Sequence, residues 1–267
     1  MKIAIAGKGG TGKTTIVGTM AREFGRQGHR VTAFDADPAP TLAMTVGIDL
    51  ARAEEAPALP PDILQLVTMP GGERGYRLRV DVSEIIDRLG LVGPDGVRLV
   101  VAGRIEHAAR GCNCGTHAAV KAILEAIVEA PGDVVLVDME AGTEHLSRSG
   151  GTLQHADVLV VVVEPFYKSL VTGRQIAGLA AELGIPRQFG VLNKVRGPDD
   201  LGTLTEFCEE NGLTPLGSVP WDTRLQDAES RCTAPLDFDP TAPGVEASQA
   251  LARALLEEFA APASAIR

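Results

Sequence analysis

The chain has 267 residues, and its 25 lysines and arginines against 35 aspartates and glutamates give a net charge of −10. No basic tract is present that would follow a nucleic-acid backbone, and no uncharged apolar run approaches the roughly 18 residues of a transmembrane helix, so we expect neither nucleic acid nor a membrane as a partner. The apolar N-terminal run is too short for a secretory signal. We therefore expect a cytoplasmic protein with a single domain, residues 1–267, built on one sheet.

Short runs rich in valine and isoleucine alternate along the chain with segments of helical spacing. They predict strands at Lys2–Ala6, Arg30–Phe34, Ile63–Met69, Val97–Ala102, Val134–Val137, Val158–Val163 and Phe189–Leu192. Strands buried on both faces of a parallel sheet are apolar without strict alternation, so we expect a doubly wound, mostly parallel α/β sheet flanked by helices. Apolar stripes predict helices over 16–24 and 118–128 and around Leu251, Leu255 and Phe259.

The segments between these elements include three that we expect to be irregular. Proline-rich stretches at 51–62 and 233–244 predict surface loops. The stretch 71–80, which carries Arg74, Arg77 and Arg79, predicts an excursion near the ligand edge; the sequence assigns no role to these arginines.

The segment Gly7–Thr14 fits the pattern G-x-x-x-x-G-K-[ST] between a predicted strand and a predicted helix. Consecutive backbone N–H groups of such a loop cradle phosphates at a helix N-terminus, which predicts contacts from Gly9, Gly10, Thr11, Gly12, Lys13, Thr14 and Thr15. Lys13 would reach the β and γ phosphates, and Thr14 would ligate Mg²⁺. The sequence therefore predicts an ATPase that binds ATP and ADP with Mg²⁺.

Carboxylates follow two other predicted strands. Asp138 ends the run before "MEAG" and is expected to hold Mg²⁺ through water, while Asp35 and Asp37 end the second strand. We assign Asp35 to the magnesium site and Asp37 to the positioning or deprotonation of the attacking water. The alternative is that the two aspartates cap the next helix.

The base would bind where another strand ends. Ligands of open α/β sheets sit at the carboxyl edge, so Asn193 and Lys194 are candidate base contacts. Pro220 and Asp222 are expected to close over the ring. A single Asn-Lys pair is by itself a weak pattern, and its place in the strand order strengthens it.

A second lysine, Lys8, distinguishes this loop from an ordinary one. The pattern K-G-G-x-G-K-[ST]-T resembles the deviant Walker A group of P-loop ATPases, which includes MinD, ParA and the nitrogenase iron protein. That resemblance implies that Lys8 acts in trans on the phosphates of a partner in a nucleotide-sandwiched homodimer. Within the group, "GCNC" at 111–114 and "DMEAGTEHL" at 138–146 resemble the CooC nickel-insertion ATPases, which implies nickel–iron carbon monoxide dehydrogenase as the client.

Cys112 and Cys114 supply two thiolates, and thiolates suit Ni²⁺ or Zn²⁺. A tetrahedral site needs four ligands, so the same pair from both subunits of a symmetric dimer would complete it. Thr116 is expected to cap the following helix and to place the thiols before its N-terminus. The alternative is two small residues in a tight turn. We expect His107 and His117 to be surface or capping residues, and Cys208 and Cys232 to be structural.

These features together suggest that ATP closes a dimer and changes the geometry of the four thiolates, so that hydrolysis controls metal capture or release. The alternatives are a MinD- or ParA-type positioning or partition ATPase, a maturation ATPase for another metalloenzyme, an iron–sulfur reductase like the nitrogenase iron protein, and a small-molecule kinase. The reductase would need a cysteine after Asp138, where "DMEAGTEHL" has none, and no acceptor site for a kinase is evident in the sequence. A positioning or partition ATPase would need a basic amphipathic tail or a basic surface, and the C-terminal sequence is neither strongly basic nor broadly apolar.

Overall fold

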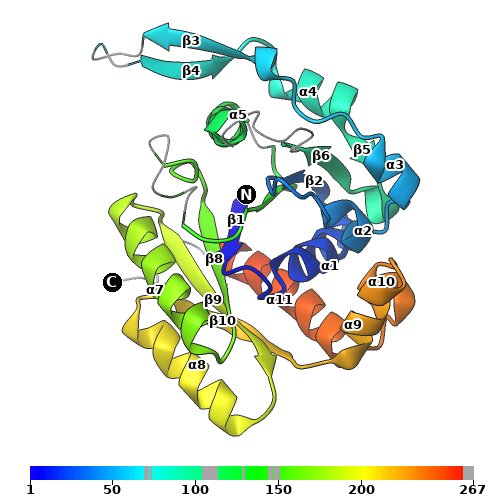
Figure 1. Ribbon diagram of the computed structural model, residues 1–267, viewed down its shortest axis with the longest axis vertical. Helices are drawn as coiled ribbons and strands as arrows, with labels where there is room; N and C mark the ends of the chain where they lie inside the picture. The colour runs from blue at the N-terminus through cyan, green and yellow to red at the C-terminus, as the bar shows by residue number, and fades with distance from the viewer. Residues whose placement is uncertain are drawn as a thin grey trace.

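A computed structural model describes residues 1–68, 72, 74–103, 114–127, 130–143, 146 and 151–260 (Figure 1). Its main sheet has eight strands in the order β10-β9-β8-β1-β7-β2-β6-β5. The strands span β1 Lys2–Gly7, β2 Arg30–Asp35, β5 Leu91–Val92, β6 Arg98–Val101, β7 Asp133–Asp138, β8 Val158–Val163, β9 Arg187–Val195 and β10 Thr214–Pro220. The predicted mostly parallel α/β sheet is confirmed.

The centre of this sheet is parallel and buried. β1 lies between β7 and β8, with Ile5 opposite Asp138 on one side and Val160 on the other, and only the short edge strand β5 runs antiparallel within the described sheet. All six residues of β8 are buried. Valine-rich strands with no polar face are stable only where helices cover both sides, and this explains why the sequence pattern identified them.

Two layers of helices cover the sheet. Alternate residues of β1 point to opposite faces, since Ile3 and Ile5 belong to one apolar cluster and Ala4 and Ala6 to another. The Ile3 face packs against α1 Lys13–Arg26, α2 Leu42–Val46 and α11 Pro243–Ala260. The Ala4 face packs against α4 Val82–Leu89, α5 Cys114–Ala126, α7 Tyr167–Glu182 and α8 Pro198–Glu210. The predicted terminal helix is thus confirmed as α11.

The expectation of a single sheet is wrong. β3 Leu64–Thr68 lies in the predicted strand 63–69, but it pairs antiparallel with β4 Arg74–Leu78 in a separate two-stranded sheet that projects beside α5 in Figure 1. Leu66 is 55% exposed, whereas every residue of β8 is buried. Gln65 and Thr68 interrupt the apolar run, so this strand has no two-sided apolar surface to bury in the central sheet.

The predicted loops also contain regular structure. The arginine-containing stretch 71–80 holds β4, and α5 packs against that strand. The proline-rich stretches include the short helices α3 Leu50–Glu54, η1 Pro61–Ile63 and α10 Pro235–Phe238, while η2 Pro94–Gly96 and α9 Thr223–Ser230 lie outside them. Proline is accommodated because it stands at the first helical turn, where its missing N–H is no loss.

Within the described ranges, no helix combines the length and the apolar character needed to cross a bilayer.

Candidate active site

The loop between β1 and α1 turns at glycines that no other residue could replace without strain. Gly7 has φ +156°, and a Cβ there would lie 2.6 Å from the carbonyl oxygen of Val162. Gly12 has φ +90° and a Cβ would lie 2.5 Å from Nδ2 of Asn193. At these two positions the backbone of the loop passes so close to β8 and to the end of β9 that side chains are excluded, as in loops whose backbone N–H groups bind an anion.

Lys13 begins α1 and is almost completely buried beneath this loop. Its Nζ lies 3.4 Å from the carbonyl oxygen of Lys8. Burial lowers the pKa of Lys13, and the nearby charges of Asp138 and Asp37 oppose that shift. A further anion close to Lys13 would stabilise its charged form, and a nucleotide phosphate would supply that anion.

Asp138 and Asp35 end adjacent strands, opposite each other in the register of β2 and β7. Burial, followed by the repulsion of Asp35, raises the pKa of Asp138 to about 8, while a hydrogen bond from the Thr14 hydroxyl opposes the shift. Oδ1 of Asp138 is buried and has no hydrogen-bond partner among the described residues. A hydroxyl, an unpartnered carboxylate oxygen and a second carboxylate fit Mg²⁺, which binds few protein ligands besides phosphates and water.

Asp35 also has a structural task. Its carboxylate accepts hydrogen bonds from the backbone N–H of Leu42 at 2.8 Å and of Asp37 at 3.2 Å, so it caps the start of α2. Burial raises its pKa to about 6 in spite of these bonds. Asp37 is only partly buried and accepts from the N–H of Ala39 at 2.9 Å. The capping alternative thus describes Asp35, whereas the contact of Asp37 is with Ala39, which precedes α2 Leu42–Val46.

Lys8 is half-buried and lies directly before the two exposed glycines of the loop, Gly9 and Gly10. Its Nζ donates to the carbonyl oxygen of Gly9 at 3.0 Å, within the same chain. The Lys8 carbonyl accepts from the Thr11 hydroxyl at 2.9 Å and so braces the turn. Among the residues that the structure describes, the Lys8 side chain makes only this local hydrogen bond, which would not prevent it from extending away from the loop.

The predicted base contacts Asn193 and Lys194 do come together with the phosphate loop. Nδ2 of Asn193 donates to the Thr11 carbonyl, and Nζ of Lys194 donates to the Gly10 carbonyl. A cavity of about 150 Å³ adjoins them, with walls that include Gly12, Asn193, Pro220, Trp221, Gln226 and Glu229. Sequence reasoning did not single out Trp221, Gln226 or Glu229, because α9 brings the last two back to the loop from a segment that carries no motif.

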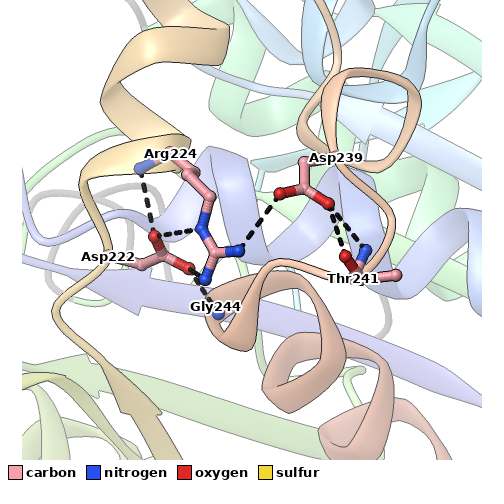
Figure 2. A network of polar contacts seen from close by, with 5 residues as sticks. All are labelled: Asp222, Arg224, Asp239, Thr241 and Gly244. Atoms are coloured by element: carbon pink, nitrogen blue, oxygen red, sulfur yellow. Dashed lines mark hydrogen bonds and ion pairs between the residues drawn. The ribbon is translucent and has the colours of Figure 1, made fainter.

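Asp222 lines the same cavity, but its carboxylate is occupied by the fold (Figure 2). It accepts from the backbone N–H of Arg224 and Gly244, both at 3.0 Å, so it caps α9 and holds the first turn of α11. The Arg224 guanidinium bonds Asp222 and reaches on to Asp239 at 3.1 Å. Both carboxylate oxygens of Asp222 are thus used within the fold, and the contacts of Asp222 and Pro220 with the base stay predictions.

Residues 2–236 match CbiA, the CobQ/CobB/MinD/ParA nucleotide binding domain. The chain belongs to this family. It is a nucleotide-binding P-loop ATPase, and it is 38% identical over 265 residues to the carbon monoxide dehydrogenase accessory protein CooC of Rhodospirillum rubrum, covering 96% of this chain and 97% of that protein. It is also 30% identical to nitrogenase iron protein 2 of Methanothermobacter thermautotrophicus, covering 85% and 79%. The resemblance to CooC is confirmed.

Solved structures show the same fold. The septum site-determining protein MinD of Pyrococcus horikoshii, in complex with Mg-ADP, superposes with a TM-score of 0.72 at 17% identity, covering 99% of this chain and 98% of that one. MinD of Aquifex aeolicus gives a TM-score of 0.67 at 21% identity, covering 96% of both chains. At such identities the likeness is one of architecture.

Of the two predicted cysteine ligands, only Cys114 lies among the described residues. Cys112 and His107 lie outside the described residues, and Cys114 is the first residue of α5 with its side chain undescribed. The prediction that Thr116 caps α5 is wrong, because the helix already begins two residues earlier. Within the described ranges, no three His, Cys, Asp or Glu side chains gather as a metal site.

His117, which sequence reasoning placed at the surface or in a cap, is 3% exposed. Its Nε2 lies 3.4 Å from Oε2 of Glu140, two residues after Asp138. The helix that begins at Cys114 thus contacts the segment that follows the Asp138 carboxylate. No sequence signal points to this pair, since the two residues are 23 positions apart on different elements.

Proposed function

We propose that this ATPase is a metallochaperone that couples ATP-driven dimerisation to the insertion of nickel into nickel–iron carbon monoxide dehydrogenase. The observation that carries the proposal is the similarity to CooC along nearly the whole of both chains, together with the Cys-x-Cys motif at Cys112 and Cys114. The protein would act in the cytoplasm as a single domain of residues 1–267, and its cargo would be Ni²⁺ or Zn²⁺ held by the thiolates of two subunits.

In the nucleotide site, Thr14, Asp35 and Asp138 would hold Mg²⁺, which supplies positive charge to the β and γ phosphates when bound. The N–H groups of Gly9, Gly10, Gly12, Lys13 and Thr15 orient the phosphates, and Lys13 adds an ammonium in a buried setting where its charge acts strongly. Asp37 is partly buried and its charge acts on Lys13, and its carboxylate would orient the attacking water. Lys8 would extend to the phosphates of the partner subunit.

The contact between His117 and Glu140 suggests how the two sites communicate. Met139 donates its N–H to Ile5 and Gly142 to Gly7, so the segment after Asp138 is tied to the strand that carries the phosphate loop. Glu140 lies inside this segment and touches α5 three residues after Cys114. A shift of the segment on γ-phosphate binding or release would therefore move the N-terminal turn of α5 and the thiolate that it carries.

The test is metal content and mass of the full-length protein, measured by elemental analysis and light scattering without nucleotide, with ADP and with a non-hydrolysable ATP analogue. We expect one Ni²⁺ or Zn²⁺ per dimer in the wild type and none in Cys112→Ser or Cys114→Ser. Cys232→Ser is the matched control, because Cys232 is exposed and free. Unchanged metal content in both motif variants, or a monomer under every condition, would contradict the proposal.

The client is tested separately by activating nickel-free carbon monoxide dehydrogenase with the nickel-loaded protein and ATP. Activation that fails with Cys112→Ser supports the assignment. A protein that loads nickel and hydrolyses ATP but never activates this enzyme would instead be a maturation ATPase for another metalloenzyme.

A further inference from the structure

Side chains from β9 hold the phosphate loop by its carbonyl groups. Asn193 holds the carbonyl of Thr11 and Lys194 that of Gly10, while the N–H of Thr11 donates to Lys8 at 3.3 Å. The C=O and N–H of a trans peptide point in opposite directions. Holding the Thr11 carbonyl toward Asn193 therefore directs the N–H of Gly12 away from β9, and fixing the Gly10 carbonyl sets the plane of the peptide before it.

Lys194 is itself held by a buried carboxylate. Its Nζ lies 2.7 Å from Oε2 of Glu164, whose side chain is 9% exposed. Glu164 directly follows β8, the strand that lies between β9, which carries Lys194, and β1, which leads into the phosphate loop. Its own backbone is fixed, because its N–H donates to the Ser169 hydroxyl at 3.1 Å and its carbonyl accepts from Phe166 at 2.7 Å.

The backbone conformation of Lys194 indicates that surrounding contacts hold this residue in place. It has φ +60°, a left-handed conformation that is uncommon for a residue with a Cβ, and its N–H donates to Oδ1 of Asn193 at 2.9 Å. Such a conformation persists only where several contacts determine it together. Here the contacts are the Asn193 amide at one end and Glu164 with the Gly10 carbonyl at the other.

We propose that Glu164 is a positioning residue for ATP binding: by pairing with Lys194 it keeps that ammonium on the Gly10 carbonyl and so holds the phosphate loop in its anion-binding conformation. A lysine side chain is long, flexible and strongly hydrated, so it stays against a neutral carbonyl only if a counter-charge keeps it there. Gly10 has φ +82° and open space around it, so the loop has the freedom to relax once Lys194 leaves.

Glu164→Gln in the full-length protein tests this, because the amide keeps the shape and removes the charge. A charge-assisted contact corresponds to about 10- to 100-fold in affinity, so we expect the KM for ATP and the dissociation constants of ATP and ADP to rise by that factor, with kcat changed less than about threefold. ATP and ADP are affected alike because both present the β-phosphate to this loop. Glu206→Gln and Lys168→Met, exposed residues on α8 and α7, are the controls.

Lys194→Met and the double variant show whether the two residues act as a pair. If Glu164 works through Lys194, the double variant binds ADP no more weakly than Lys194→Met alone. Losses that multiply would overturn the proposal, as would unchanged ADP affinity and KM in Glu164→Gln. Should Glu164→Gln not fold, wild-type ADP affinity in Lys194→Met would overturn it instead. Metal binding at the cysteines is not involved, so the outcome is independent of the metallochaperone proposal.

Discussion

Asp138 and Asp35, on one side of the phosphate loop, differ from Asp222, which follows β10, in how their charges are satisfied. Asp138 and Asp35 are desolvated and face each other, and burial raises the pKa of both. Burial would also raise the pKa of Asp222, but hydrogen bonds from the N–H groups of Gly244 and Arg224, then from the Arg224 side chain, outweigh it and hold that pKa below its ordinary value. The charge of Asp222 is thus satisfied by hydrogen bonds within the fold, whereas the charged form of Asp138 would need a bound cation.

The difference teaches how to separate functional from structural carboxylates. A buried carboxylate oxygen with no donor destabilises the fold unless a ligand compensates for it, and Asp138 Oδ1 is such an atom. A carboxylate that caps two helices stabilises the fold with no ligand at all. Substitution of the first should therefore reduce activity and leave stability intact, and substitution of the second should do the opposite.

The largest expected effect is on catalysis. Asp138→Asn keeps the volume of the side chain and removes the charge that would hold Mg²⁺, so kcat should fall by about 100- to 1,000-fold, as when other groups that stabilise transition-state charge are removed. Steady-state ATPase assays measure the loss. The thermal midpoint without nucleotide should stay the same or rise, and a clear fall would show that Asp138 is a structural residue like Asp222.

The next effect is on the pH dependence of stability without nucleotide and Mg²⁺. The native pKa of Asp138 is about 8 against 3.8 for an unperturbed carboxyl, so between these values the folded state keeps a proton that the unfolded state has released. Stability should therefore fall as pH rises from 5 to 7, by at most about 1.4 kcal/mol per pH unit for the proton of Asp138, and Asp35, whose native pKa is about 6, steepens the fall below that pH. Urea denaturation at several pH values measures it.

Asp138→Asn should flatten this slope, and Mg²⁺ with ADP should do so in the wild type. Asp222 predicts the reverse sign in a different window. Its lowered native pKa means that its contribution is complete above 3.8 and is lost only as pH falls below that value. A wild-type slope that Asp138→Asn leaves unchanged would contradict the assignment.

The smallest effect is on stability alone. Asp222→Ala removes the caps of α9 and α11 and should lower the free energy of unfolding by about 1 to 2 kcal/mol. At a temperature well below the midpoint its kcat should stay close to wild type. Asp222→Asn, which keeps one acceptor oxygen, should lose less. A selective rise in the KM for ATP without any loss of stability would show that the carboxylate contacts the base after all.

Much of the fold could be predicted because its signals are local. The strands β1, β2, β6, β7, β8 and β9 were found because burial on both faces imposes an apolar composition. β3 was misplaced in the main sheet because a short apolar run does not specify its partner. β10 was missed because two prolines, Pro215 and Pro220, and Gly217 break its pattern, as an edge strand permits.

The sequence by itself determined the phosphate loop, since backbone conformation at glycines and the chemistry of Lys13 and Thr14 are encoded in consecutive residues. It also determined Asp138, which is the last residue of an apolar strand. Only the tertiary structure decided which polar side chains near that loop are structural and which are available. Glu164 and Lys194 are 30 positions apart, and both are far in sequence from the phosphate loop that they adjoin. Asp222 meets Gly244 only because the N-termini of α9 and α11 converge there. Such pairings depend on how strands and helices pack against one another, and no local sequence pattern predicts that packing.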